Sequence, residues 1–342
     1  MSHDLENEAQ FEGSILGFLY RQWTPRKQIP KGTNLSGQTA IVTGSNSGLG
    51  LEAARQLLQM GLECLVMGVR SQARGDTAAG LLREEFPDST VSVWLLDMES
   101  YDSVTSFARR CETLPRIDIV LLNAGMRGDA FRVVEITEHE QSFQVNYLST
   151  ALLTILLLPT LKSKRLQWNS PPPRLSIVSS DTALWASLET SGPIFAQFDK
   201  PESFYPMRNY QRGKLLQLFF TAKLAGSVSA EDVIINASNP GYCKGTDFDK
   251  GRKFSVTFSI LMGLLKLATG RTVEVGASTL VDAVVMHDKA SHGSYVSDWA
   301  IRPFPEMMYK EGAQDVSDRI WEETLEELNF AGVSQIVRDM QR

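Results

Sequence analysis

Short apolar stretches alternate with helix-like stretches along the chain from residue 38 onward. In the first helix-like stretch, Leu51, Ala54 and Leu58 share one helical face, and Gly61 marks its expected end. Strands separated by helices predict βαβ crossovers, and hence a doubly wound, parallel α/β sheet. The seven expected strands are mostly apolar throughout, as strands covered on both faces are, and they are Thr39–Thr43, Glu63–Val69, Thr90–Leu96, Ile117–Leu122, Arg174–Ser179, Val233–Ala237 and Gly293–Ser297.

Two stretches interrupt this alternation as inserted loops. Residues 167–173 (QWNSPPP) contain three prolines, which forbid a helix, and residues 181–208 combine three prolines with many aromatic side chains. No long polar linker divides the chain. We therefore expect an N-terminal arm over residues 1–35 and one catalytic domain over residues 36–342, which ends in a helix near Val316–Leu328.

Two further stretches are apolar enough to raise the question of a membrane. Residues 11–23 lack the Lys/Arg-rich face of interfacial helices, which favours packing on the core or on a partner over a membrane surface. Residues 254–268 contain Lys266 and are shorter than the ~20 residues of a spanning helix. They predict a buried or partner-facing helix, or an apolar lid over about 247–272. We expect no transmembrane segment, and peripheral membrane contact stays open.

Composition and charge exclude several classes of protein. Hydrophobic residues make up 43% of the chain and charged residues 22%, a globular balance, and the net charge of −6 without a basic run argues against nucleic-acid binding. The cysteines Cys64, Cys111 and Cys243 lie far apart, and the four histidines are scattered, so we expect neither disulfides nor a metal site. The acidic N-terminal stretch does not resemble a signal peptide, which favours a cytoplasmic location.

A glycine-rich turn follows the first expected strand and opens the first helix. In the spacing Gly44-x-x-x-Gly48-x-Gly50, the first glycine makes the turn, the second lets a pyrophosphate approach the backbone, and the third lets helix and strand pack closely. The helix N-terminus offers unpaired N–H groups to phosphate oxygens. The turn therefore predicts a Rossmann-type dinucleotide site, which the residues between these glycines complete: Ser45, Asn46, Ser47 and Leu49.

The end of the second strand indicates which dinucleotide binds. An NAD site usually has a carboxylate there for the ribose 2′-hydroxyl, whereas this chain has Val69 and Arg70. A guanidinium can pair with a 2′-phosphate, so NADP(H) is favoured over NAD.

Tyr210 and Lys214 place a phenol and an ammonium on one face of a helix. The opposite charge of a nearby lysine lowers a tyrosine pKa and favours phenolate. Alone, this spacing is a weak signal because it often occurs by chance.

Together, these features resemble the short-chain dehydrogenase/reductase family, above all its retinol-dehydrogenase-like and fungal members. The resemblance covers about residues 36–300. It rests on a set of motifs in one order: Thr43–Gly50, Asn123-Ala124-Gly125, Asn146, Ser179-Ser180, Tyr210 with Lys214, and Asn239-Pro240-Gly241.

The resemblance implies four catalytic residues. Tyr210 would exchange a proton with the substrate oxygen, and Lys214 would lower the tyrosine pKa and hold the nicotinamide ribose. Ser180, rather than Ser179, would hydrogen-bond the substrate carbonyl, and Asn146 would hold a water in a proton relay.

The same resemblance implies further contacts with the cofactor. Asn123, Ala124 and Gly125 would lie beneath it, and Asp97 with Met98 would contact the adenine. Pro240 and Gly241 would border the nicotinamide. Thr246 would bind the carboxamide, although it stands one residue later than the family threonine usually does.

The sequence thus predicts an NADP(H)-dependent oxidoreductase. Its substrate would be a hydrophobic small molecule, either a ketone and secondary alcohol or an aldehyde and primary alcohol, and family analogy places it in specialised metabolism. A non-redox cyclase, isomerase or dehydratase on the same scaffold is the alternative, and a binding protein without turnover is a third hypothesis. Five aromatic residues of the insertion favour an apolar pocket: Trp185, Phe195, Phe198, Phe204 and Tyr205.

The family often dimerises through long helices, here near residues 137–165 and 205–228. The N-terminal arm and residues 254–268 could block that surface, so both a homodimer and a monomer stay open.

Overall fold

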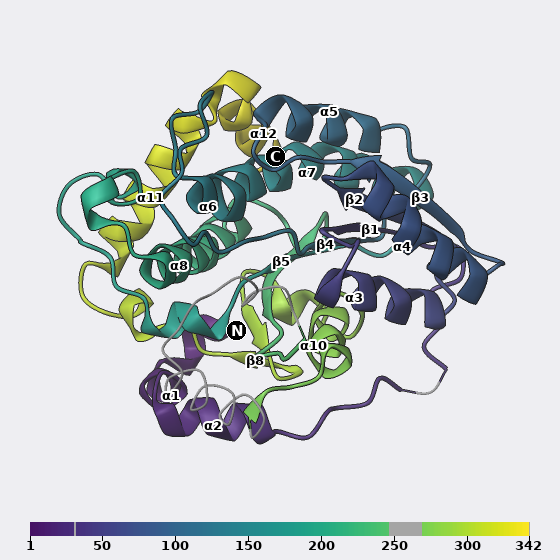
Figure 1. Ribbon diagram of the computed structural model, residues 1–342, viewed down its shortest axis with the longest axis horizontal. Coiled ribbons are helices and arrows are strands. Elements are labelled where there is room, and N and C mark those ends of the chain that lie inside the picture. The colour runs from purple at the N-terminus through teal and green to yellow at the C-terminus, as the bar shows by residue number, and fades with distance from the viewer. Residues whose placement is uncertain (31, 246–268, 342) are drawn as a thin grey trace.

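The computed structural model describes residues 1–30, 32–245 and 269–341. Within them, one sheet of eight strands runs in the order β3-β2-β1-β4-β5-β6-β7-β8 (Figure 1). All neighbouring pairs are parallel except β7 and β8, which are antiparallel. The bounds are β1 Thr39–Thr43, β2 Cys64–Val69, β3 Thr90–Leu95, β4 Ile119–Leu122, β5 Arg174–Val178, β6 Ile234–Asn239, β7 Tyr295–Ser297 and β8 Ala300–Arg302.

Helices cover both faces of the sheet, which confirms the predicted doubly wound α/β fold. One apolar cluster joins the sheet to α3 (Gly48–Gln59), α4 (Gln72–Glu85) and α10 (Val273–Val285). The other face packs on α5 (Tyr101–Cys111), α7 (Ser149–Trp168) and α8 (Pro206–Ala225) (Figure 1). Every residue of β1 and β4 is buried, which explains why these strands are apolar throughout.

The strand bounds match the sequence pattern to within two residues at each end. The pattern missed β8, because three residues at a sheet edge show no periodicity of their own. The expected C-terminal helix is α11 (Ala313–Glu327), and it is followed by α12 (Val333–Met340). These two helices pack on α8 and α7, so they cover part of the surface from which a dimer was expected. The choice between homodimer and monomer stays a prediction.

The N-terminal arm contains two helices, α1 (Glu6–Glu12) and α2 (Ile15–Trp23), which lie at the lower left of Figure 1, below β8. The arm does pack on the core, but through its polar side. Arg21 and Gln22 are 3% and 6% exposed, whereas Ile15 is 75% exposed. The apolar spacing of α2 therefore did not identify its buried face.

Two aromatic residues of the insertion after β5 belong to the core. Phe198 is fully buried, and its ring stacks on Phe143 with 4.2 Å between the ring centroids. Phe195 meets the same ring edge-on at 5.1 Å. None of the five aromatics is among the residues that line the cavity described below, so the apolar pocket inferred from them stays a prediction.

Among the described residues, one continuous helix is long and apolar enough to cross a membrane. It runs over Gln141–Trp168, from α6 (Gln141–Phe143) through a π-helical turn (Gln144–Leu148) into α7. Because 89% of its apolar window is buried inside the fold, its composition is that of a core helix. The division at residue 36 and the cytoplasmic location stay predictions.

We predict that Phe198→Ala lowers the free energy of unfolding by about 3–5 kcal/mol, because the truncated ring leaves a cavity against Phe143. Urea titrations of wild type and variant measure this difference. Tyr205, 62% exposed in the same insertion, is the matched control, and Tyr205→Ala should change stability by less than about 0.5 kcal/mol. A cost below about 1 kcal/mol for Phe198→Ala would instead assign this ring to a solvent-accessible pocket.

Candidate active site

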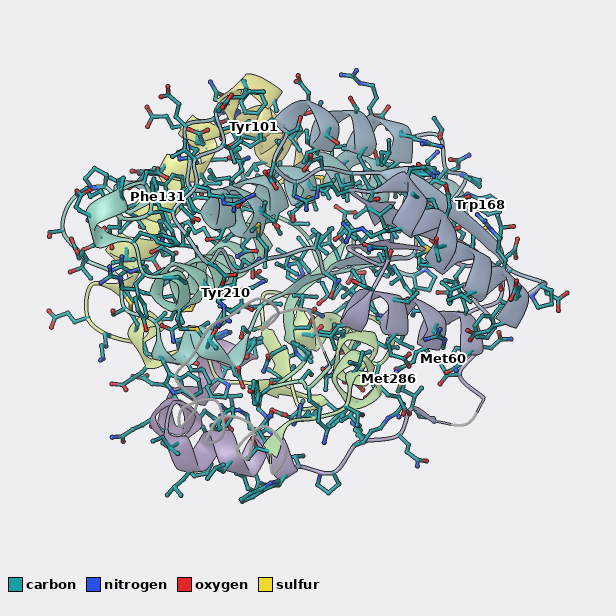
Figure 2. All side chains as sticks on the ribbon, viewed as in Figure 1. Met60, Tyr101, Phe131, Trp168, Tyr210 and Met286 are labelled. Atoms are coloured by element: carbon teal, nitrogen blue, oxygen red, sulfur yellow. The ribbon has the colours of Figure 1, made fainter. Side chains whose placement is uncertain are left out.

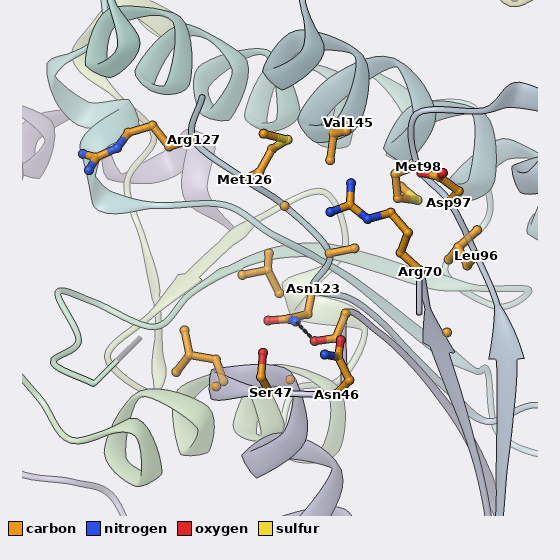
Figure 3. Close-up of a pocket in the computed structure, with 18 of the residues that line it drawn as sticks. Asn46, Ser47, Arg70, Leu96, Asp97, Met98, Asn123, Met126, Arg127 and Val145 are labelled. Atoms are coloured by element: carbon orange, nitrogen blue, oxygen red, sulfur yellow. Dashed lines mark hydrogen bonds between the residues drawn. The ribbon is translucent and has the colours of Figure 1, made fainter. Parts of the chain in front are cut away.

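A cavity of about 460 Å³ lies at the carboxyl ends of the central strands, around the reversal of strand order between β1 and β4. In α/β sheets of this kind, ligands bind at that reversal. Most of the predicted site residues line the cavity (Figure 3), and they are Gly44, Asn46, Ser47, Gly48, Leu49, Gly50, Arg70, Asp97, Met98, Asn123, Ala124, Gly125, Tyr210, Lys214 and Pro240.

The glycine turn has the shape that a pyrophosphate requires. Gly48 adopts a φ of +56°, and a Cβ built on it would meet nothing within 4 Å, so its backbone is open to a ligand at the start of α3. At Gly50, a Cβ would lie 2.5 Å from Asn123 Nδ2 and 2.6 Å from the Gly44 carbonyl oxygen. Both glycines are therefore required for the reasons that the spacing predicts, and the turn fits a dinucleotide.

Asn123 joins the ends of the two central strands. Its amide nitrogen donates to the carbonyl oxygens of Thr43 and Gly44 at 3.0 and 3.3 Å, one of which is drawn in Figure 3. The N–H of Ala124 donates to Thr43 Oγ1 at 2.9 Å. These bonds hold the floor of the cavity rigid before any ligand arrives.

The part of the cavity where the adenosine was predicted contains two arginines and two carboxylates. Arg70 is 59% exposed at its side chain and pairs with Glu99 at 2.6 Å, and Figure 3 shows it beside Asp97 and Met98. Arg74 lines the same end. An exposed ion pair contributes little to stability, so Arg70 can exchange Glu99 for a phosphate at small cost.

Tyr210 lies at the other end of the cavity, on α8. It is 8% exposed and lies well inside the outline of the molecule in Figure 2. Burial is the largest influence on the phenol and raises its pKa; a hydrogen bond with Ser180 opposes this shift, and the charge of Asp181 adds to it. Burial, and not the charge of Lys214, therefore has the largest effect on the pKa of Tyr210. The sequence analysis expected the lysine to lower this pKa, whereas the structure raises it.

Lys214 is held one turn further along α8. Its Nζ donates to the Val178 carbonyl oxygen at 2.7 Å and lies 5.7 Å from the centroid of the Tyr210 ring. A Cβ on Gly125 would lie 3.5 Å from this nitrogen and 3.1 Å from Asn146 Oδ1, so the lysine and the asparagine lie close together. Burial lowers the pKa of Lys214 to about 7.

Asn146 lies in the π-helical turn, and its polar groups already have partners. Its side chain exchanges two hydrogen bonds with the backbone of Met126, at 2.8 and 2.7 Å. The backbone carbonyl oxygen of Asn146 accepts a hydrogen bond from Gln217 Nε2 at 2.6 Å. The sequence did not indicate Gln217, whose relation to Asn146 depends on two helices packing together. The role of Asn146 in a water relay stays a prediction.

Some predicted residues lie off the cavity wall. Ser45 is fully buried and donates to the Val42 carbonyl oxygen at 2.9 Å, so its side chain faces the core. Ser180 and Asn146 are not among the residues that line the cavity, although Ser180 is hydrogen-bonded to Tyr210, which does line it. Gly241 is also absent from the lining. Thr246 and most of the lid predicted at 247–272 lie outside the described residues.

The cavity also has lining residues that the sequence reasoning missed. Several follow the ends of strands, where parallel strands bring their next residues to one edge, so extending each strand by a few positions would have identified them. The missed residues are Gly68, Arg74, Leu96, Glu99, Met126, Arg127, Asp129, Val145 and Val178. Ser179, which was considered and set aside in favour of Ser180, also lines the cavity.

Comparison with known proteins identifies the family of the chain. Residues 38–167 match the family described as short chain dehydrogenase. The short chain dehydrogenase virL of Hypocrea virens is 53% identical over 342 residues, which is 100% of both chains. The short chain dehydrogenase/reductase mfmJ of Annulohypoxylon moriforme is 44% identical over 330 residues, which is 94% of each.

A solved structure shows the same fold at low sequence identity. A variant of actinorhodin polyketide ketoreductase with NADPH is 17% identical, has a TM-score of 0.57, and aligns over 76% of this chain and 95% of its own.

The buried lysine predicts a pH dependence of stability. Between pH 7 and about 10.4, the unfolded chain holds the Lys214 proton that the folded chain has already released. Because the unfolded state then binds more protons, stability rises with pH in this window, by up to ~1.4 kcal/mol per pH unit from this group. Below pH 7 both states hold the proton, and the dependence disappears.

The test compares wild type with Lys214→Met in urea titrations from pH 6 to 9.5. Other titrating groups occur in both proteins, so the difference in unfolding free energy isolates Lys214. We expect wild type to gain stability relative to Lys214→Met above pH 7. A difference that is flat or falls with pH would contradict the lowered pKa.

Proposed function

The chain belongs to the short-chain dehydrogenase/reductase family, in its fungal branch, and is an oxidoreductase; on this premise we propose that it is NADP(H)-dependent and acts on a hydrophobic small molecule. We propose that it interconverts a ketone and a secondary alcohol, or an aldehyde and a primary alcohol.

The observation that carries this proposal is the coexistence of two groups in one cavity. The glycine turn, with Gly48 open to a ligand, lines one end, and Tyr210 and Lys214 line the other. A dinucleotide held at its phosphates by the turn would reach toward the phenol with its far end. One extended dinucleotide would contact both the glycine turn and the Tyr210/Lys214 pair. This arrangement supports a redox enzyme over a cyclase or an isomerase.

The choice of NADP(H) rests on charge at the adenosine end. β2 ends at Val69 without a carboxylate, and Arg70 and Arg74 follow it at the cavity. Two guanidinium groups would hold a 2′-phosphate by charge-assisted bonds. Arg70 pairs with Glu99 in the structure, and this ion pair would have to break before Arg70 could bind the phosphate.

When bound, the cofactor supplies or accepts a hydride. The residues of the chain handle the proton. Because its pKa is raised, Tyr210 keeps its proton at neutral pH and can donate it from Oη to a carbonyl oxygen, which favours the reductive direction. Ser180, hydrogen-bonded to Tyr210, would share that oxygen and stabilise its developing charge. Lys214, fixed at Val178, would hold the nicotinamide ribose.

The substrate proposal rests on the apolar part of the cavity wall. Met126, Val145 and Val178 line the cavity, and they offer a surface to an apolar carbon skeleton. The fungal relatives and the polyketide ketoreductase with the same fold are consistent with a specialised metabolite as substrate.

Tyr210→Phe tests the proton donor. We expect it to reduce the rate of carbonyl reduction by at least about 100-fold, because general acid catalysis is lost, while NADPH binding stays within about threefold of wild type. Absorbance of reduced nicotinamide reports turnover, and fluorescence titration reports binding. Retained turnover would remove Tyr210 from its role, and product formation without cofactor consumption would indicate the non-redox alternative.

Arg70→Ala tests the choice of cofactor. We expect the Kd for NADPH to rise about tenfold, because a charge-assisted pair is lost, and the Kd for NADH to stay unchanged. Arg55, which pairs with Glu52 and Glu85 on the surface, is the matched control, and Arg55→Ala should change neither Kd. An equal loss for both cofactors, or none, would contradict the assignment of NADP(H).

A further inference from the structure

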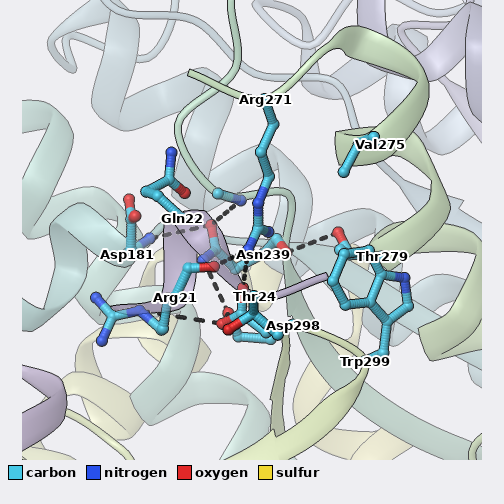
Figure 4. Close-up of polar contacts among 12 residues, drawn as sticks. Arg21, Gln22, Thr24, Asp181, Asn239, Arg271, Val275, Thr279, Asp298 and Trp299 are labelled. Carbon is cyan, nitrogen blue, oxygen red and sulfur yellow. Dashed lines mark hydrogen bonds and ion pairs between the residues drawn. The ribbon is translucent and has the colours of Figure 1, made fainter. Parts of the chain in front are cut away.

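The polar side of the N-terminal arm contacts the loop that follows β6, next to the cavity. This loop begins at Pro240, which lines the cavity, and includes Gly241 and Tyr242. Three segments far apart in the sequence meet there: α2, the loop, and the stretch around Arg271 (Figure 4).

Gln22 makes the central contacts. Its amide nitrogen donates to the carbonyl oxygen of Tyr242 at 2.9 Å and to that of Thr269 at 3.0 Å, and its amide oxygen accepts from the N–H of Tyr242 at 3.1 Å. The side chain is 6% exposed. One amide therefore links the backbones of two different segments by hydrogen bonds that are buried or partly buried.

Gly241 shows how closely the arm approaches. It adopts a φ of +73°, and a Cβ on it would lie 2.7 Å from Gln22 Oε1 and 2.8 Å from Arg271 Nη1. The loop beside the predicted nicotinamide position is therefore packed directly against the arm, with no space for an added methyl group.

A buried ionic cluster holds Gln22 in place. Arg271 donates to the carbonyl oxygens of Arg21 and Pro240 and pairs with Asp298. Arg21 pairs in turn with Glu12 of α1. The side chains of these two arginines are each 3% exposed, so the ion pairs of the cluster are buried inside the fold.

Asn239 connects the loop after β6 to the turn that follows Ser180. Asn239 Oδ1 accepts from the N–H groups of Asp181 and Gly241, both at 3.1 Å, so it joins the turn after Ser180 to the loop after β6. Burial raises the pKa of Asp181, and Arg21 is the charge that opposes this shift most. The arm thus contacts the loop after β6 directly and acts on Asp181 through the charge of Arg21, and none of its residues lines the cavity.

We propose that Gln22 is a positioning residue, through which the N-terminal arm holds the Pro240–Tyr242 loop in the conformation that receives the nicotinamide end of the cofactor. This inference rests on the proposed function, because it assumes that the Pro240–Tyr242 loop contacts bound NADP(H). The adenosine end, at Arg70 and Asp97, lies at the opposite end of the cavity and receives no contact from the arm among the described residues. Gln22 should therefore affect one half of the cofactor and not the other.

The experiment replaces Gln22 by methionine, which keeps the side-chain volume and removes all three hydrogen bonds. Two probes are titrated into the full chain: NADP⁺, and adenosine 2′,5′-bisphosphate, which carries only the adenosine end. We expect the Kd for NADP⁺ to rise about tenfold and the Kd for the bisphosphate to stay within about twofold of wild type. The fluorescence enhancement of bound NADPH, which reports the nicotinamide environment, should fall as well.

Gln10, an exposed residue of α1, supplies the matched control, and Gln10→Met should leave both affinities unchanged. Unchanged bisphosphate binding shows that the Gln22→Met protein is folded. Equal changes for the two probes, or no change for either, would overturn the positioning role. If wild type bound neither probe, the proposed function itself would fail, and this inference with it.

Discussion

The close approach of α3 to the ends of β1 and β4 is the constraint on which the site depends. Gly50 lies against the Gly44 carbonyl and Asn123, and the Asn123 amide bonds the two backbone carbonyls at the end of β1. A larger residue at position 50 would separate the helix from the sheet and open this junction. Because the strand order reverses here, the same junction creates the crevice and points the start of α3 into it.

Burial shapes the chemistry at the far end of the crevice. Tyr210 and Lys214 lie on one helix, and burial moves both toward their neutral forms: the phenol keeps its proton, and the pKa of the lysine falls to about 7. A neutral phenol beside an apolar wall suits donation to a carbonyl oxygen. The ionic cluster around Arg271 shows that the chain accepts buried charge where two segments must be held together.

The sequence pattern predicted those parts of the structure that depend on local neighbours. Strands covered on both faces read as apolar runs, and the glycine turn and Tyr210/Lys214 each lie within one short segment. It failed where partners are distant. Gln22 bonds residues 220 and 247 positions away, so the spacing of α2 could not show that its polar side is buried. The sequence also could not show whether Phe195 and Phe198 pack in the core or line a pocket, because aromatic residues in a loop can do either. The roles assigned to individual site residues stay predictions.

A crystal structure of the chain with NADP⁺ tests the central claim most directly. The account predicts density for the pyrophosphate against the backbone at Gly48, for the 2′-phosphate at Arg70, and for the nicotinamide beside Tyr210 and Lys214. A cofactor bound elsewhere, or one whose nicotinamide end lies away from the Tyr210 phenol, would contradict it.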